Sequence, residues 1–314
     1  MSSPVLQYPE YAVVGATDVP AMALFFSAFG MVPLRSATIP AEATAALYGA
    51  SGPATQVIMH TPGSNRRVRI VSTDQPALPF QPLVAGPYGL DYFSRDLDVT
   101  IGMVKAAGGH NFTPLVGYGA EPTRHPDADP ADKNYEILFQ GPDELTVYVT
   151  DIDQSPKRYA SLLDEDETLV NSELIMLCWV IGNTGDRERQ FWEEEVGVDV
   201  VGDGYPDNAD MVELMYHPRP TPTRCLNITD TGRNTKIEIM SYPEEEVATP
   251  PIWPLRGGLF AGGFSVPSVA AAIADLPSAS FGEVVTFLDP DDGEITAVTG
   301  TSPAGVRFEL RGRP

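Results

Sequence analysis

One order of elements recurs four times along this chain of 314 residues. In the first copy, a strand-like run at 11–14 leads to Asp18-Val19-Pro20, which is a typical start of a helix. Apolar residues at helical spacing follow, and Gly30 ends the helix. Two further strand-like runs at 56–60 and 67–72 complete the copy. Recurrence of one supersecondary unit is the signature of a modular fold, so the chain is expected to consist of four similar units.

The three later copies keep the same order of strand, helix and further strands. The predicted helix of the second copy begins at Asp96, that of the third carries Phe191-Trp192, and that of the fourth spans 269–276. The predicted strands are 90–93, 135–139 and 145–150 in the second copy, and 174–181, 211–216 and 236–240 in the third. In the fourth copy they are 259–266, 283–288, 295–299 and 306–310. An aromatic pair before a closing glycine occurs in the first copy and again in the third. The chain is therefore predicted to have two similar halves.

The domain prediction follows from this order. We expect an N-terminal pair of modules at 1–153, an acidic linker at 154–172, and a C-terminal pair of modules at 173–314. The acidic run at 161–168 interrupts the strand pattern and is typical of a solvated connection. The long Pro- and Asp-rich stretch at 118–134 is predicted to leave the second module as a loop, and such loops often serve as lids or binding loops.

Composition narrows the classes of partner. The net charge is −23, from 43 acidic and 20 basic residues, and this disfavours nucleic acids and anionic membranes, which attract clustered Lys and Arg. The N-terminus lacks a secretory signal, and no stretch reaches the ~18 apolar residues needed to span a bilayer. With only two cysteines, no disulfide framework is indicated. We therefore expect a cytoplasmic protein whose partner is a small organic molecule, and a homodimer is compatible with this expectation.

Several local motifs carry a family resemblance. The strand exit Ser94-Arg95-Asp96-Leu97-Asp98 leads into a helix that ends at Gly108-Gly109. The turns Gly141-Pro142-Asp143-Glu144-Leu145 and Ser302-Pro303-Ala304-Gly305-Val306 precede final strands. With the fourfold recurrence, these features resemble the vicinal-oxygen-chelate superfamily of glyoxalases, bleomycin-resistance proteins and extradiol dioxygenases, in its two-domain form. The resemblance covers nearly the whole chain. It implies an α+β fold of four βαβββ modules paired into two cup-shaped, mixed β-sheet domains.

The resemblance also implies positions for a divalent metal, on the first and last strands of each module. Residue by residue, these positions carry Tyr11, Arg69, Gly89, Tyr148, Leu177, Glu238, Ala261 and Glu309. The two expected histidines are absent, and two carboxylates alone make a poor transition-metal site. No cofactor is therefore expected, and a divalent Fe, Mn, Zn or Ni ion is left as an open alternative that depends on the register of the alignment.

The candidate site residues follow from these positions and from strand alternation. The catalytic candidates are Glu238, Glu309, Tyr148, Arg69 and Asp91, and the substrate-binding candidates are Tyr11, Trp179, Phe93 and His217. A carboxylate in an apolar cup has a raised pKa that suits a general acid or base, and tyrosine hydroxyls with a guanidinium can hold an oxyanion. A structural ion pair, such as Glu309 with Arg307, is the alternative explanation of the same charges.

Three functions remain open on this basis. The first is a lyase or isomerase that acts by acid–base chemistry next to a carbonyl or enol of an aromatic or polyketide-like compound, without the usual metal. The second is a metal-free protein that binds and sequesters a small apolar compound. The third is a metal-dependent, dioxygenase-like enzyme with unusual ligands. The fold itself does not choose among them, because one fold supports many chemistries.

Overall fold

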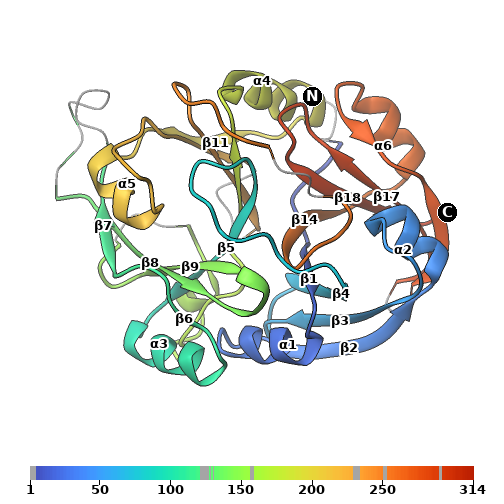
Figure 1. The fold of residues 1–314 in the computed structure, drawn as a ribbon, viewed down its shortest axis with the longest axis horizontal. Helices are drawn as coiled ribbons and strands as arrows, with labels where there is room; N and C mark the ends of the chain where they lie inside the picture. The colour runs from blue at the N-terminus through green and yellow to red at the C-terminus, as the bar shows by residue number, and fades with distance from the viewer. Residues whose placement is uncertain are drawn as a thin grey trace.

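The computed structural model describes residues 5–120, 127, 129, 131–155, 159–228, 234–249, 253–289 and 292–314. The strands form two mixed sheets of nine strands each, which occupy the two sides of the molecule in Figure 1. Each sheet combines two βαβββ modules. The predicted α+β class, with four modules paired into two curled sheets, is confirmed.

The first sheet has the order β15-β17-β18-β14-β1-β4-β3-β2, with β16 paired to β17. Its first strands β1 and β14 run antiparallel at the centre, and each is parallel to the last strand of its own module. The bounds are β1 (Tyr11–Ala16), β2 (Val32–Ile39), β3 (Ala54–His60), β4 (Arg67–Ser72), β14 (Gly258–Ser265), β15 (Ser280–Phe281), β16 (Val285–Asp289), β17 (Gly293–Thr301) and β18 (Arg307–Gly312).

The second sheet repeats this arrangement, in the order β11-β12-β13-β10-β5-β9-β8-β6, with β7 paired to β8. Here β5 and β10 are the antiparallel central pair. The bounds are β5 (Gly86–Ser94), β6 (His110–Asn111), β7 (Val116–Tyr118), β8 (Asn134–Gln140), β9 (Thr146–Asp151), β10 (Met176–Ile181), β11 (Val200–Gly204), β12 (Arg224–Ile228) and β13 (Lys236–Ser241). The two sheets are therefore built on one plan.

The helices begin where a capping side chain satisfies free backbone N–H groups. Asp18, Asp96 and Ser268 each accept a hydrogen bond from the backbone N–H three residues on, at the starts of α1, α3 and α6. The bounds are α1 (Val19–Ser27), α2 (Ala41–Tyr48), α3 (Leu97–Ala106), α4 (Gly185–Gln190), α5 (Asn208–Leu214) and α6 (Val269–Asp275), with short turns η1 (Pro142–Glu144), η2 (Leu162–Asp164) and the π-helical η3 (Phe191–Val196). Within the described residues, no helix is long and apolar enough to cross a membrane.

The partnership of the modules differs from the sequence expectation. Consecutive modules, expected to pair within 1–153 and within 173–314, lie in different sheets: the first module pairs with the fourth and the second with the third. The chain crosses between the sheets after β4 and again after β13, and described residues of the two crossings meet where Val84 is bridged to Ala248. Repeats in a sequence define modules but not partners, because partnership is decided by long-range contacts such as those of β1 with β14.

Strand alternation gives each sheet two different faces. The outer faces of both sheets share one large core with α1, α3, η3 and α6. The opposite faces, here called the cup faces, hold two separate clusters, one against α2 in the first sheet and one against α5 in the second. These two helices are inserted between the second and third strands of modules one and three, and they lie at opposite ends of the molecule in Figure 1.

Local predictions were wrong or incomplete mainly around these insertions. The predicted strand at 211–216 is mostly helix α5, which the Asp207 carboxylate caps by accepting from the Ala209 N–H. The third module instead takes its middle strands from β11 and β12, which were not predicted from the sequence. Strand β2 and helix α2 were also missed. All are short, and most of β2 is exposed, so none shows a strong apolar period.

Candidate functional site

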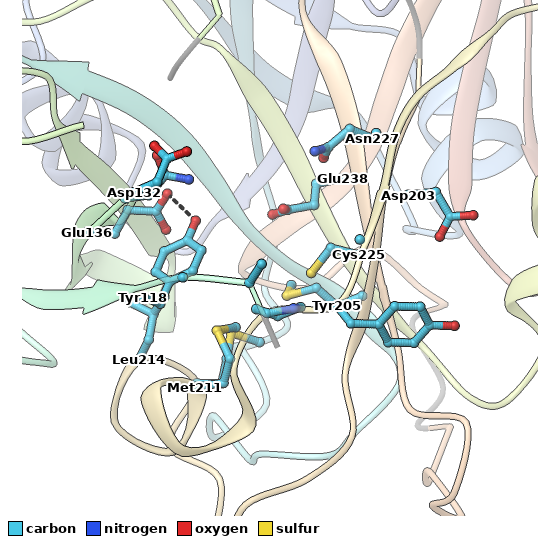
Figure 2. Close-up of a pocket in the computed structure, with 18 of the residues that line it drawn as sticks. Tyr118, Asp132, Glu136, Asp203, Tyr205, Met211, Leu214, Cys225, Asn227 and Glu238 are labelled. Carbon is cyan, nitrogen blue, oxygen red and sulfur yellow. Dashed lines mark hydrogen bonds between the residues drawn. The ribbon is translucent and has the colours of Figure 1, made fainter. Parts of the chain in front are cut away.

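A cavity of about 650 Å³ opens on the cup face of the second sheet (Figure 2). Strands β7, β8, β9, β12 and β13 and helix α5 contribute its walls, with β11 at the rim. A second lobe of about 460 Å³ shares Glu136, Asn227 and Glu238 with it, and extends to Phe93, Met176 and Tyr159. The space is large enough for a small organic ligand.

Alternation explains which side chains face this cavity. On β13, Glu238 and Met240 lie two residues apart and both line it, while Ile237 and Ile239 enter the core on the outer face. Glu136 on β8 faces the cavity in the same way, between Tyr135 and Ile137. In Figure 2, the carboxyl groups of Glu136 and Glu238 point toward one another from opposite sides of the cavity.

Glu136 is held in place by two hydroxyl groups. The Tyr118 hydroxyl donates a 2.8 Å hydrogen bond to Glu136 Oε1, and the Thr150 hydroxyl donates to the same oxygen at 3.1 Å. Burial, aided by the nearby Glu238 charge, raises the pKa of Glu136 to about 7, although the two hydrogen bonds oppose the rise. A carboxyl group with such a pKa exchanges protons readily at neutral pH.

Two further acids share this environment. Burial also raises the pKa of Glu238, while a hydrogen bond from the Cys178 thiol opposes the rise. Asp91 on β5 is 2% exposed, and neither carboxylate oxygen has a hydrogen-bond partner among the described residues. Burial, followed by the charges of Glu136 and Glu238, raises the pKa of Asp91 well above its usual range. Three carboxyl groups therefore hold fewer than three negative charges at neutral pH.

The rest of the described lining is apolar, acidic or polar without charge. Met211, Leu214, Met215 and Met240 form an apolar wall beside Tyr148, and Asp127, Asp132 and Asp203 lie in the outer part. The described lining residues include no Lys, Arg or His. Nearby cations have partners of their own: Lys133 pairs with Asp210, and Arg224 pairs with Asp203 and Asp186. Lys236 lies over the Tyr159 ring. The site therefore favours uncharged or cationic ligands over anions.

Around Glu309, the cup face of the first sheet is filled by side chains instead. Tyr11 and Tyr48 each donate a 2.8 Å hydrogen bond to Glu309, one to each carboxylate oxygen, and Arg311 Nε lies 2.5 Å from Oε1. Glu309 is fully buried. These contacts describe a structural ion pair, with Arg311 as the partner rather than the expected Arg307. We therefore do not retain Glu309 as a catalytic candidate.

Arg69 belongs to the same closed network. Its guanidinium lies 3.3 Å from Asp289 and 2.7 Å from Asp292, and 4.6 Å from the Tyr11 ring centroid. The Tyr11 ring in turn occupies the space over Gly263, where an added Cβ would lie only 1.9 Å from a ring carbon. Structural contacts therefore account for both Arg69, which we expected to be catalytic, and Tyr11, which we expected to bind substrate.

The remaining predictions divide between the two faces of the second sheet. Glu238, Tyr148 and Phe93 line the cavity, and Asp91 lies behind it. Trp179 and Leu177 are in the outer core, so Trp179, which we expected to bind substrate, is not among the described lining residues. Cys178 takes the cup position assigned to Leu177. The run 174–181 is apolar throughout, so its sequence does not reveal which residues face the cup.

His217 is the other misplaced candidate. It follows α5 rather than a strand, and its Nε2 lies 2.9 Å from the Tyr242 hydroxyl instead of near Glu238. Burial lowers its pKa to about 4, so the imidazole is neutral. Glu136, Tyr118 and Asn227 were missed. The signal for Glu136 was present, since it is a lone acid within the apolar strand 135–139.

The divalent metal that the sequence resemblance implied does not fit the described residues as they are arranged. Among the described residues, no three His, Cys, Asp or Glu side chains converge in the geometry of a metal site. In the first sheet, Glu309 is saturated by hydroxyl and guanidinium donors. In the second, the described donors are carboxyl groups and the thiols of Cys178 and Cys225, all with raised pKa values, and no imidazole is among them. We derive no chemistry through a metal.

Comparison with known structures identifies the fold. Glyoxalase I from Zea mays superposes with a TM-score of 0.65 at 12% sequence identity, over 97% of this chain and 92% of that one. A protein from Bacillus subtilis subsp. subtilis str. 168, provisionally described as a dioxygenase, gives 0.59 at 9% identity, over 99% and 87%. No family model and no curated sequence matches. The chain has the vicinal-oxygen-chelate fold, and at these identities the likeness concerns the fold alone.

Proposed function

We propose that the cavity of the second sheet binds a small organic molecule and moves protons on it by acid–base chemistry. The observation that carries this proposal is the pair Glu136 and Glu238, which face one another across the cavity (Figure 2). Both have raised pKa values, and each carboxyl group disfavours ionisation of the other. In such a pair a protonated carboxyl group serves as the acid and an ionised one as the base.

The pair suits an isomerase or lyase acting next to a carbonyl. The carboxylate removes a proton from the carbon beside the carbonyl, and the protonated carboxyl group donates its proton to the developing enolate oxygen. Return of a proton to a different carbon completes an isomerisation, and loss of a β-substituent completes an elimination. The uncharged hydroxyl of Tyr118 holds Glu136 in position, and burial raises its own pKa, so it acts as a hydrogen-bond donor and not as a base.

The lining indicates the kind of substrate. Methionine and tyrosine side chains offer an adaptable apolar surface suited to an aromatic or polyketide-like compound. The acidic character of the described lining disfavours a substrate that carries its own carboxylate or phosphate. Asn227 Oδ1, which has no hydrogen-bond partner within the described residues, offers an acceptor for a ligand hydroxyl or amine.

Proton exchange tests this function without knowledge of the natural substrate. Aryl 1,3-diketones are incubated with the full chain in D₂O, and deuterium uptake at the carbon between the carbonyls is followed by NMR. The expected result is catalysed uptake that Glu136→Gln and Glu238→Gln each slow by about 100-fold or more. Glu213→Gln, an exposed position on α5 outside the cavity, is the matched control and should exchange at the wild-type rate.

Sequestration without reaction is the second candidate, favoured by the methionine-rich wall of Met211, Met215 and Met240. A diketone that binds with saturable affinity and shows no catalysed exchange would favour this binder over the enzyme. Saturable binding that substitution of Glu136 and Glu238 leaves unaffected would place the ligand outside this cavity and overturn both candidate functions.

A further inference from the structure

Arg307, the first residue of β18, is a buried arginine without an anionic partner. It is 8% exposed, and its guanidinium carbon lies 4.6 Å from the Phe260 ring centroid and 5.5 Å from that of Trp253. Within the described part of the chain it makes no ion pair, and its Nε has no hydrogen-bond partner. Aromatic faces stabilise the planar cation from the side but leave its N–H edge unsatisfied.

Among the described residues, the neighbouring arginines of the same cup face have the carboxylate partner that Arg307 lacks. Arg69 and Arg311 both pair with Asp289. Burying a cation is costly unless a carboxylate or phosphate compensates it, and Arg307 is the exception on this face. Burial lowers the pKa of Arg307 to about 10, so the guanidinium is still protonated at neutral pH.

The guanidinium borders a cavity of about 300 Å³ near the end of α2. Ser280 and Thr301 supply hydroxyl groups to its wall, and Phe281 and Trp253 supply apolar surface. Trp253 is 41% exposed and packs against Gly49, where an added Cβ would lie 2.6 Å from the indole ring. Glu283 is the one carboxylate among the described lining residues, and its side chain is exposed at the rim.

We propose that this cavity binds the oxyanion of a small organic acid on Arg307, with the apolar part of the ligand against Trp253 and Phe281. A carboxylate and a phosphate monoester both match the planar donor fork of arginine, so the ligand class is an aromatic or aliphatic oxyanion. The site lies in the first sheet, separate from the acidic cavity of the second. It favours anions, whereas the acidic cavity disfavours them, and it does not depend on the proposed function.

Tryptophan fluorescence tests this proposal on the full chain. Trp179 and Trp192 are buried in the core, so a change on adding an anion reports Trp253. Titrations with benzoate and with phenyl phosphate should each be scored for saturation, and the tighter of the two identifies the preferred oxyanion. Arg307→Met should weaken that binding at least tenfold. Arg313→Met, an exposed arginine just beyond the same strand, should leave it unchanged.

A second variant keeps the test independent of the folding of Arg307→Met. Glu283→Gln removes the carboxylate from the rim and should tighten anion binding several-fold. Arg307→Met should also keep a thermal midpoint at least as high as that of the wild type, because an apolar chain replaces an unpaired buried cation. The proposal is overturned if neither anion saturates at about 10 mM, or if Arg307→Met binds as tightly as the wild type.

Discussion

Glu136 and Glu238 face one another across the cavity, and the charge of Glu238 is one cause of the raised pKa of Glu136. This relationship makes stability depend on pH. The folded state retains a proton on Glu136 that the unfolded state releases at its ordinary pKa of 4.5. Retaining this proton contributes about 3 kcal/mol to the free energy of unfolding. The contribution is complete below pH 4.5 and is lost as pH rises through about 7.

His217 acts in the opposite direction, because its pKa falls from 6.5 unfolded to about 4 folded. Its contribution is present above 6.5 and is lost as pH falls toward 4. We therefore expect the difference in free energy of unfolding between Glu136→Gln and wild type, rather than the wild-type curve, to show the Glu136 effect. Urea unfolding at a series of pH values should show the variant gaining stability relative to wild type as pH rises from 4.5 to 7.5. A flat difference would contradict the assigned pKa.

Removing the Tyr118 hydroxyl should move this titration. Its hydrogen bond lowers the pKa of Glu136, so Tyr118→Phe should raise that pKa further and shift the Glu136-dependent limb of the exchange rate to higher pH. Hydrogen bonds to charged groups are worth about 1.5–3 kcal/mol, which sets the upper size of the effect. The pH profile of deuterium exchange measures it. An unshifted profile would show that another group controls the rate.

Breaking the network of the first sheet should cost stability and not chemistry. Glu309→Gln replaces one of the two buried carboxylates on Arg311 with a neutral amide, while Asp289 remains as the other. Losing one member of a buried pair costs up to about 3–5 kcal/mol. Chemical unfolding measures the loss, and exchange per folded molecule should equal that of the wild type. A stable Glu309→Gln protein with lost exchange would restore Glu309 as a catalytic residue.

Gly263→Ala should have a related effect through packing alone. The added methyl group would meet the Tyr11 ring at 1.9 Å, so the ring must move away from Glu309. Overpacking of this kind costs about 1–3 kcal/mol. The thermal midpoint of Gly263→Ala should therefore fall. Gly30→Ala is a separate test of backbone strain alone, because Gly30 has φ +80° and nothing lies within 4 Å of the new Cβ.

Chelation tests directly whether the site needs a metal. We expect the thermal midpoint and the exchange rate to be the same before and after treatment with EDTA, because the carboxyl groups of the cavity do not converge as metal ligands. Metal analysis of the purified protein accompanies this measurement. Stoichiometric Fe, Mn, Zn or Ni, with loss of exchange on chelation, would restore the dioxygenase-like alternative.

The sequence predicted the modules well because each has strong local signals. Helix caps such as Asp18 and Asp96, and the apolar strands that follow, depend on residues close in the chain. The partnership of modules depends on contacts between β1 and β14, far apart in sequence, and no local pattern encodes it.

The same distinction explains the candidate site. Glu238 was found because its strand alternates, and Trp179 was misassigned because the strand 174–181 is apolar on both faces. Glu136 was missed because it lies on a third strand of its module, outside the family's ligand positions, and its partner Glu238 belongs to another module. Arg307 was noted only as an ion-pair partner of Glu309, since its aromatic neighbours come from β14 and a distant loop.

The crossing of the chain between the sheets after β4 and again after β13 bears on the order of synthesis. The sheet that carries the acidic cavity is made from the continuous stretch 86–241, whereas the other sheet needs both ends of the chain. On the ribosome, the first module must wait for the fourth before β1 meets β14, and an open strand edge is an aggregation hazard during that time. We therefore expect the middle of the chain to become compact first, with the N-terminal module as the part most in need of chaperones.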